Sequence, residues 1–138
     1  MKKDQWMSMS KLSKSEYEAL ADFRYQLRRF LRFSEDVTRK SGITVLQYLL
    51  MLQIKGFPGR EWATVGELAE RLQAKQHGVV SLISRCETAG LVRRCTSEND
   101  KRVVEVRLTP KGALSLERLA RLHRKEAQSL RGEFAVTH

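Results

Sequence analysis

A short amphipathic segment, residues 76–86, carries the side chains with the most evident chemistry. Apolar residues recur there at helical spacing and predict an inward face made of Val79, Leu82, Ile83 and Cys86. Helical geometry places polar groups and one valine on the opposite face, at Gln76, His77, Val80, Ser81, Ser84 and Arg85. No acidic residue lies between Glu70 and Glu87. Because phosphates repel carboxylates, this pattern predicts a helix that enters a groove of double-stranded DNA.

The residue types on this face favour a division of roles in DNA binding. Lys75 and Arg85 carry positive charges that would meet phosphates. Amide, imidazole and hydroxyl groups that can reach base edges come from Gln76, His77 and Ser81. Val80 could touch a thymine methyl group. Gly78 costs about 1 kcal/mol of helix propensity relative to alanine, and we expect it to let the helix approach the DNA backbone closely.

A second short helix is predicted just before this one, across a tight turn. Thr64 and Glu67 have the spacing of a capping box, and apolar residues follow at positions i, i+3, i+4 and i+7. After the second helix of the pair, Gly90 lies where glycine commonly terminates a helix. Two short amphipathic helices joined in this way have the composition of a helix-turn-helix.

Beyond Gly90 the apolar period changes from 3.6 to 2, which predicts a β-hairpin. Strands are expected at 91–96 and 103–108, around a polar turn. The hairpin residues that we expect to serve DNA binding are Arg94, Asp100, Lys101 and Arg102. We expect Arg102 to contact phosphate or the minor groove, with Asp100 orienting it or holding the turn. A hairpin in this position fits the wing of a winged helix-turn-helix.

Long helices are predicted on both sides of this lobe. Residues 15–41 have an apolar side broad enough to suggest packing against both its own domain and a second chain. Thr109 and Pro110 supply an N-cap and a first helical residue for the last helix, 110–138. The expected organisation is a basic flexible arm at 1–14, the first long helix at 15–41, the DNA-binding lobe at 42–109 and the last helix at 110–138. The predicted fold class is mainly α (α+β).

Composition favours a polyanionic partner. Lys and Arg number 26 against 16 Asp and Glu, giving a formal net charge of +10 and a sequence pI of about 10.1. No apolar run approaches the roughly 20 residues needed to span a bilayer, and the first 15 residues lack the apolar core of a signal peptide. We therefore expect a cytoplasmic protein.

Neither metal chemistry nor catalysis is indicated by the residue pattern. The only cysteines, Cys86 and Cys95, are nine residues apart, without the paired spacing or clustered histidines of a zinc site. No catalytic triad order, phosphate loop or pair of inward carboxylates emerges, so we expect no enzyme and no cofactor. Cys86 is most simply a small buried hydrophobe. Cys95, next to Arg94, has a more electropositive setting, and a redox role for either thiol is the less favoured alternative.

Five segments in register resemble the MarR family of transcriptional regulators, and the resemblance extends from about Tyr17 to Leu130. The segments are Leu68-Ala69-Glu70-Arg71-Leu72, Val79 to Arg85, Glu87-Thr88-Ala89-Gly90-Leu91-Val92-Arg93-Arg94, Asp100-Lys101-Arg102 and Leu108-Thr109-Pro110-Lys111-Gly112. One departure lies at Lys75-Gln76-His77-Gly78, where the family more often has small hydroxyl residues. The base preference of the family therefore does not transfer to this chain.

This resemblance implies a homodimer built from the first and last helices, an inverted-repeat operator and repression relieved by a small molecule or by oxidation. It also implies that Asp100 and Arg102 act at the wing, as the family's D-x-R element. An effector pocket is implied between the dimer helices and the DNA-binding lobe. Its expected lining is Tyr17, Phe23, Arg24, Tyr48 and Trp62, and an aromatic carboxylate is one ligand that this composition would suit.

Two other classes of function stay open from the sequence. A non-specific architectural DNA binder would keep the wing and the basic charge but lack sequence preference. A winged-helix module for protein–protein interaction would use the exposed face of residues 79–85 for a protein partner, although the missing acidic residues count against that reading.

Overall fold

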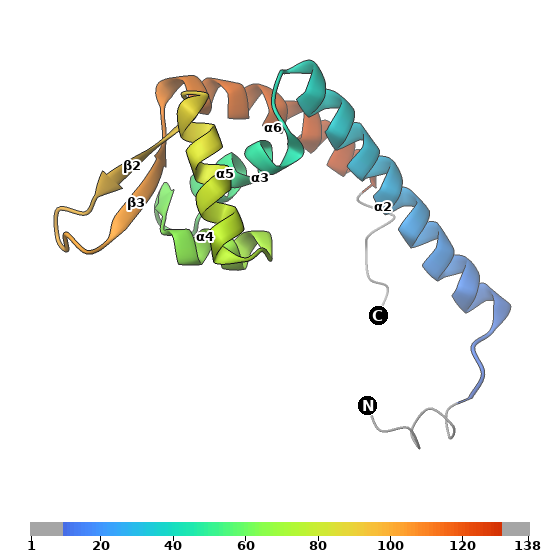
Figure 1. Ribbon diagram of the computed structural model, residues 1–138. Helices are drawn as coiled ribbons and strands as arrows, with labels where there is room; N and C mark the ends of the chain where they lie inside the picture. The colour runs from blue at the N-terminus through green and yellow to red at the C-terminus, as the bar shows by residue number, and fades with distance from the viewer. Residues whose placement is uncertain (1–9, 131–138) are drawn as a thin grey trace.

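The computed structural model describes residues 10–130, and its polypeptide forms a helical lobe with one long helix extending from it (Figure 1). Most of the basic arm expected at 1–14 lies outside the described residues, as does the end of the predicted last helix. Five helices and three short strands lie within 10–130. The fold is mainly helical with a small antiparallel sheet, as predicted for a winged helix-turn-helix.

The long first helix, α2 (Lys14–Lys40), begins at a capping box formed by Ser13 and Glu16. Its N-terminal half projects away from the lobe, and every side chain from residue 14 to 25 is exposed (Figure 1). Its C-terminal half packs against α3 and α6, burying Ser34 and Thr38. The helix therefore has a projecting half that carries exposed apolar residues and a half that is anchored to the lobe.

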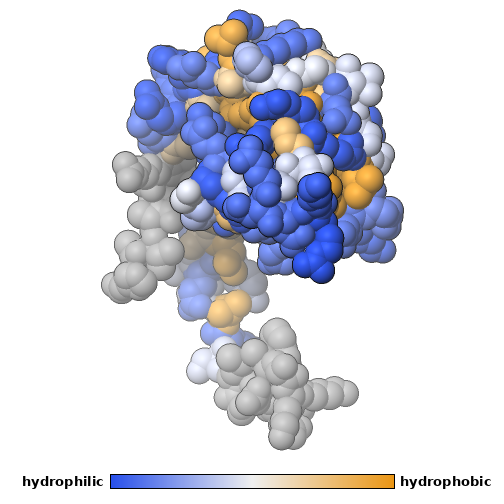
Figure 2. All heavy atoms as spheres, turned by 90° about the vertical axis from the view of Figure 1, so that its left-hand side faces the viewer, coloured by the Kyte–Doolittle hydropathy of each residue, from blue (hydrophilic) through white to orange (hydrophobic). Residues whose placement is uncertain are grey.

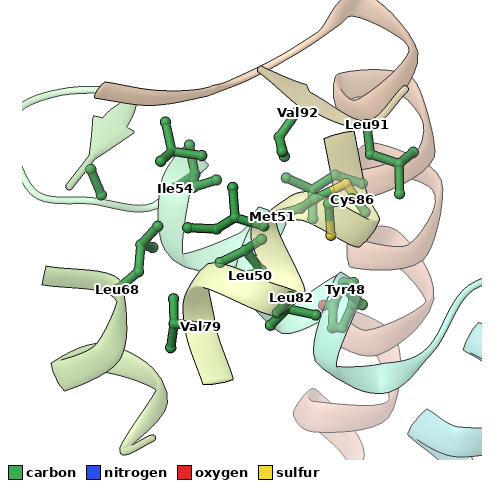
Figure 3. Close-up of a cluster of buried hydrophobic side chains, with 14 of the residues drawn as sticks. Tyr48, Leu50, Met51, Ile54, Leu68, Val79, Leu82, Cys86, Leu91 and Val92 are labelled. Atoms are coloured by element: carbon green, nitrogen blue, oxygen red, sulfur yellow. The ribbon is translucent and has the colours of Figure 1, made fainter. Parts of the chain in front are cut away.

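The core is built around α3 (Val45–Lys55), which begins at the Thr44–Gln47 capping box. Tyr48, Leu50, Met51 and Ile54 are buried on this helix. Side chains from α4, α5 and β2 converge on them, among them Leu68, Cys86 and Val92 (Figure 3). The apolar run of α3 is thus enclosed by the DNA-binding elements predicted from the sequence.

The helix pair consists of α4 (Val65–Leu72) and α5 (Gln76–Thr88). The Thr64–Glu67 capping box begins α4, and Gln73 ends it in the left-handed conformation with a φ of 51°. The four residues predicted to face inward on α5, Val79, Leu82, Ile83 and Cys86, are all buried. Gly90 follows α5 with a φ of +76°, a left-handed conformation that ends the helix and that glycine adopts easily because it has no Cβ.

The sheet has the order β1-β3-β2, with antiparallel pairing throughout. The predicted hairpin is β2 (Val92–Thr96) and β3 (Val104–Leu108). The third strand, β1 (Trp62–Ala63), was not predicted, because two residues are too few for a period-2 pattern. Its pairing with β3 ties the segment before α4 to the base of the hairpin.

The last helix, α6 (Pro110–Leu130), is anchored to the end of α5 through the segment Thr109–Gly112. The Thr109 hydroxyl donates to the Gly90 carbonyl oxygen at 2.5 Å, and Lys111 Nζ donates to that of Ala89 at 2.9 Å. Gly112 lies so close to Leu91 that a Cβ would overlap its carbonyl oxygen. The Thr-Pro-Lys-Gly segment is therefore a joint between α6 and the DNA-binding lobe.

Farther along α6, the buried His123 ties three helices together. One ring nitrogen, Nδ1, lies 2.8 Å from the Leu119 carbonyl oxygen, and the other, Nε2, lies 2.8 Å from Ser34 Oγ on α2. The imidazole stacks on Tyr48 of α3, with ring centroids 4.3 Å apart. A carbonyl oxygen only accepts, so Nδ1 carries the proton and Nε2 accepts from the Ser34 hydroxyl in the neutral ring.

Candidate nucleic-acid interface

The outward face of α5 has the composition and exposure that the sequence predicted. All six residues predicted to face outward on α5 are exposed, namely Gln76, His77, Val80, Ser81, Ser84 and Arg85. Glu87 and Thr88, at the end of the helix, are exposed as well. This exposure follows from the four buried positions, which fix the rotation of the helix against the core. Seen from the side of the hairpin, the molecular surface is largely hydrophilic with scattered hydrophobic residues (Figure 2).

The N-terminus of α5 is open to an anion. Lys75 is the N-cap residue, it is exposed, and its side chain makes no capping hydrogen bond. Backbone N–H groups in the first turn of a helix have no partner within the helix and carry partial positive charge. A phosphate at this end would accept from these groups and lie beside the Lys75 ammonium.

Gly78 lies in the first turns of α5 with open space around it. A Cβ at this position would meet nothing within 4 Å of the chain itself. Internal packing therefore does not require glycine here. The expectation that Gly78 allows close approach to a DNA backbone stays a prediction.

At the hairpin tip, Asp100 and Arg102 form the contact expected from the sequence. The carboxylate accepts from the Arg102 backbone N–H at 3.0 Å and from its Nε and Nη2 at 3.1 and 3.2 Å. These hydrogen bonds hold the pKa of Asp100 below its usual value. The Arg102 side chain is nevertheless 90% exposed, so the pair orients it without covering it. Lys101 beside it is also exposed.

Arg94, which was also expected to contact DNA from the wing, turns its side chain toward α5. Its guanidinium turns back onto α5, where Nη1 donates to Glu87 Oε1 at 2.7 Å and Nη2 to Ser84 Oγ at 3.1 Å. The Arg94 side chain is only 29% exposed, whereas that of Arg102 is 90% exposed although it also donates within the chain. Sequence reasoning placed Arg94 on a strand but had no means to predict which way the side chain turns.

In the single chain the residues expected to line an effector pocket do not come together, and a pocket between the dimer helices and the DNA-binding lobe stays a prediction. Tyr48 is buried in the core and stacked on His123. Trp62 lies on β1 beneath the Arg60 guanidinium, 3.8 Å from its ring centroid. Tyr17 and Arg24 are exposed on the projecting half of α2, and Phe23 is 42% exposed there. Residue type alone suggested that these aromatic side chains meet, but in the fold they lie in the core, on β1 and on the projecting half of α2.

The two cysteines occupy different environments. Cys86 is fully buried in the core, and burial raises the pKa of its thiol to about 11, with Arg85 opposing the shift. The predicted burial of Cys86 is confirmed, and a raised pKa leaves less of the reactive thiolate. Cys95 is half-buried on β2, in a hollow shared with Arg93 and Arg107. Within residues 10–130 no three His, Cys, Asp or Glu side chains are grouped as metal ligands.

Sequence reasoning missed a cluster in front of α4. The Arg60 guanidinium lies between the rings of Phe57 and Trp62, 4.2 and 3.8 Å from their centroids, and pairs with Glu67. Glu67 also caps α4, so the cluster fixes the loop against the first helix of the pair. The alternation of aromatic and basic residues across 57–62 was the available signal.

No helix in the described part of the chain is long and apolar enough to cross a membrane.

Comparisons with known proteins agree with this geometry. Residues 41–103 match the model of the MarR family. The chain is 30% identical over 78 residues to the HTH-type transcriptional repressor MdtR of Bacillus subtilis, covering 56% of this chain and 48% of that protein. The chain spans about half the length of the curated relatives it matches.

Solved structures share the fold over most of the chain. A MarR family protein from Bacillus stearothermophilus superposes with a TM-score of 0.75 at 21% identity, covering 91% of this chain and 86% of that one. The F27L mutant of MepR from S. aureus, solved bound to an oligodeoxyribonucleotide, gives a TM-score of 0.66 at 18% identity, with coverages of 91% and 86%. At these identities the likeness concerns the fold.

Proposed function

We propose that this chain, which belongs to the MarR family, regulates transcription by binding double-stranded DNA with α5 in the major groove and the β2–β3 hairpin beside it. One observation carries the proposal: the exposed face of α5 is polar and basic and has no carboxylate from Gln76 to Cys86. A helix of this kind suits a groove lined by phosphates.

Each part of the surface has a proposed role. Lys75, Arg85 and the open first turn of α5 meet phosphates, while Gln76, His77 and Ser81 read base edges. Arg102 enters the minor groove or meets the phosphates that flank it, held in position by Asp100. The structural neighbour solved with an oligodeoxyribonucleotide supports DNA as the partner.

We also propose a homodimer formed by α2 and α6. The projecting half of α2 carries large exposed apolar residues, among them Tyr17 and Leu20, each 58% exposed, and α6 adds Leu122 at 44%. Such residues favour burial against a second chain. A two-fold dimer would present two α5 helices about 34 to 36 Å apart, which predicts an inverted-repeat site.

Repression is the proposed direction of control, since one relative is named a repressor. A small-molecule or oxidative signal would release the DNA. Cys95 is the better-placed thiol for an oxidative signal, because Cys86 is buried with a raised pKa. Peroxide treatment that oxidises Cys95 and leaves DNA affinity unchanged would remove the oxidative route.

Selection of bound fragments from a random pool of duplex DNA tests the proposed function. Recovery of an inverted-repeat consensus supports a sequence-specific regulator. Diffuse enrichment without a consensus would replace it with an architectural DNA binder. No enrichment would replace it with a winged-helix module for protein–protein interaction.

A further inference from the structure

We propose that Arg94 is a positioning residue, which holds the hairpin on α5 and neutralises Glu87, and that it does not contact DNA itself. The inference rests on the proposed function, in which α5 and the hairpin bind one duplex together. It assigns Arg94 a role distinct from that of Arg102, the exposed arginine of the same hairpin.

The Arg94 guanidinium spans two turns of α5. Besides its contacts with Glu87 and Ser84, Nη2 donates to the Val80 carbonyl oxygen at 3.3 Å. Positions 80, 84 and 87 follow one another at helical spacing along a single face. One side chain from β2 thereby fixes both the distance and the rotation between the hairpin and α5.

The backbone of Arg94 takes part in the same contact. Its N–H donates to Glu87 Oε2 at 3.2 Å, while Glu87 Oε1 accepts from the guanidinium. Since β2 is an edge strand of the sheet, an N–H pointing away from β3 has no partner strand to bond. The two oxygens of Glu87 therefore join the sheet edge to the helix through charge-assisted hydrogen bonds.

Glu87 is the one acidic residue of α5, and Arg94 is the group that neutralises it. Without Arg94, a bare carboxylate would lie near Ser84, on the face proposed to meet DNA, and would repel phosphates. Arginine only donates, so Ser84 Oγ accepts from it and keeps its own proton available. Arg94 thus leaves Ser84 ready to donate to a phosphate or to the acceptors of guanine.

A double-mutant cycle separates positioning from direct contact. Affinities of wild type, Arg94→Gln, Glu87→Gln and the double variant are measured by fluorescence anisotropy on a duplex recovered in the selection and on a scrambled duplex. Because the main damage comes from the unpaired carboxylate, we expect Arg94→Gln to weaken binding about tenfold and the double variant to regain most of that loss. The slope of log affinity against log salt should stay at the wild-type value.

Direct contact predicts the opposite pattern. The loss on Arg94→Gln would then be the same with or without Glu87, and the salt slope would fall by about 0.9. Either result overturns the inference. Arg93→Gln is the matched control, since it removes the same charge one residue away on an exposed side chain. We expect a smaller loss from it, with no recovery on adding Glu87→Gln.

Arg94→Lys adds a charge-preserving test. Lysine keeps the charge that neutralises Glu87 but lacks the planar fork, so we expect it to lose less affinity than Arg94→Gln. A loss as large as that of Arg94→Gln would contradict the neutralisation of Glu87. Thermal unfolding of each variant shows whether the fold persists. If wild type binds no duplex, the proposed function fails; if it binds and the cycle is additive, only the role of Arg94 fails.

Discussion

At the residue scale, the structure separates arginines that stabilise the fold from arginines available to a partner. Arg60 and Arg94 are occupied by carboxylates, and Arg60 also lies between aromatic rings. Arg102 contacts Asp100 yet remains almost fully exposed. Because the pKa of Asp100 is lowered, this pair persists above the ordinary carboxyl pKa and is lost as pH falls through the lowered value. Its integrity is therefore constant around neutral pH.

Replacing Arg102 tests the role of the hairpin tip. Arg102→Ala should weaken binding to the selected and scrambled duplexes by the same factor, because a phosphate or groove-width contact carries little sequence information. The salt slope should also fall by about 0.9 for one lost phosphate contact. Anisotropy titrations on both duplexes measure these quantities. A loss confined to the selected duplex would assign Arg102 to base recognition instead.

At the element scale, periodic segments were predictable and single contacts were not. The inward face of α5 and the capping boxes of α3 and α4 follow from local spacing, which the sequence records directly. Strand β1 and the turn of Arg94 onto α5 depend on partners distant in sequence. The same holds for Tyr48, whose stacking on His123 needs α3 and α6 to meet. Such contacts have no local signature.

The joint between α5 and α6 gives a stability prediction. Gly112→Ala should lower the free energy of unfolding by about 2 to 3 kcal/mol, because the added methyl overlaps the Leu91 backbone, which cannot yield as a flexible side chain would. Gly66→Ala is the control: a helical position with open space should leave stability unchanged or raise it by up to about 1 kcal/mol. Urea unfolding measures both. Equal stability of the two variants would contradict the packing argument.

At the scale of the whole molecule, the chain combines an enclosed lobe with a projecting helix. His123 links α2, α3 and α6. A shift of α2 relative to α6 would therefore displace the stacked ring of Tyr48 in the core of the lobe. The projecting half of α2 carries large apolar residues that are more than half exposed, among them Tyr17 and Leu20 at 58% each. In the proposed dimer these residues would be buried against a second chain, which would also set the spacing of two α5 helices.

Sedimentation velocity tests this proposed assembly. Wild type should sediment as a dimer, and Leu20→Asp should shift it toward monomer, because a charge would be buried in the apolar contact between chains. Leu46→Asp, at a leucine 53% exposed on α3, is the control and should remain dimeric. A monomeric wild type, or a Leu20→Asp variant as dimeric as wild type, would argue against α2 as the dimer surface.

The most direct test of the account places a carboxylate on the exposed face of α5. Affinity for the selected duplex is measured for Ser81→Glu and for Gln128→Glu. The second variant makes the same charge change at an exposed position of α6. If α5 lies in the groove, Ser81→Glu should lose at least about a hundredfold in affinity with unfolding unchanged, and Gln128→Glu should lose little. Equal, small losses from both variants would show that this face does not meet DNA.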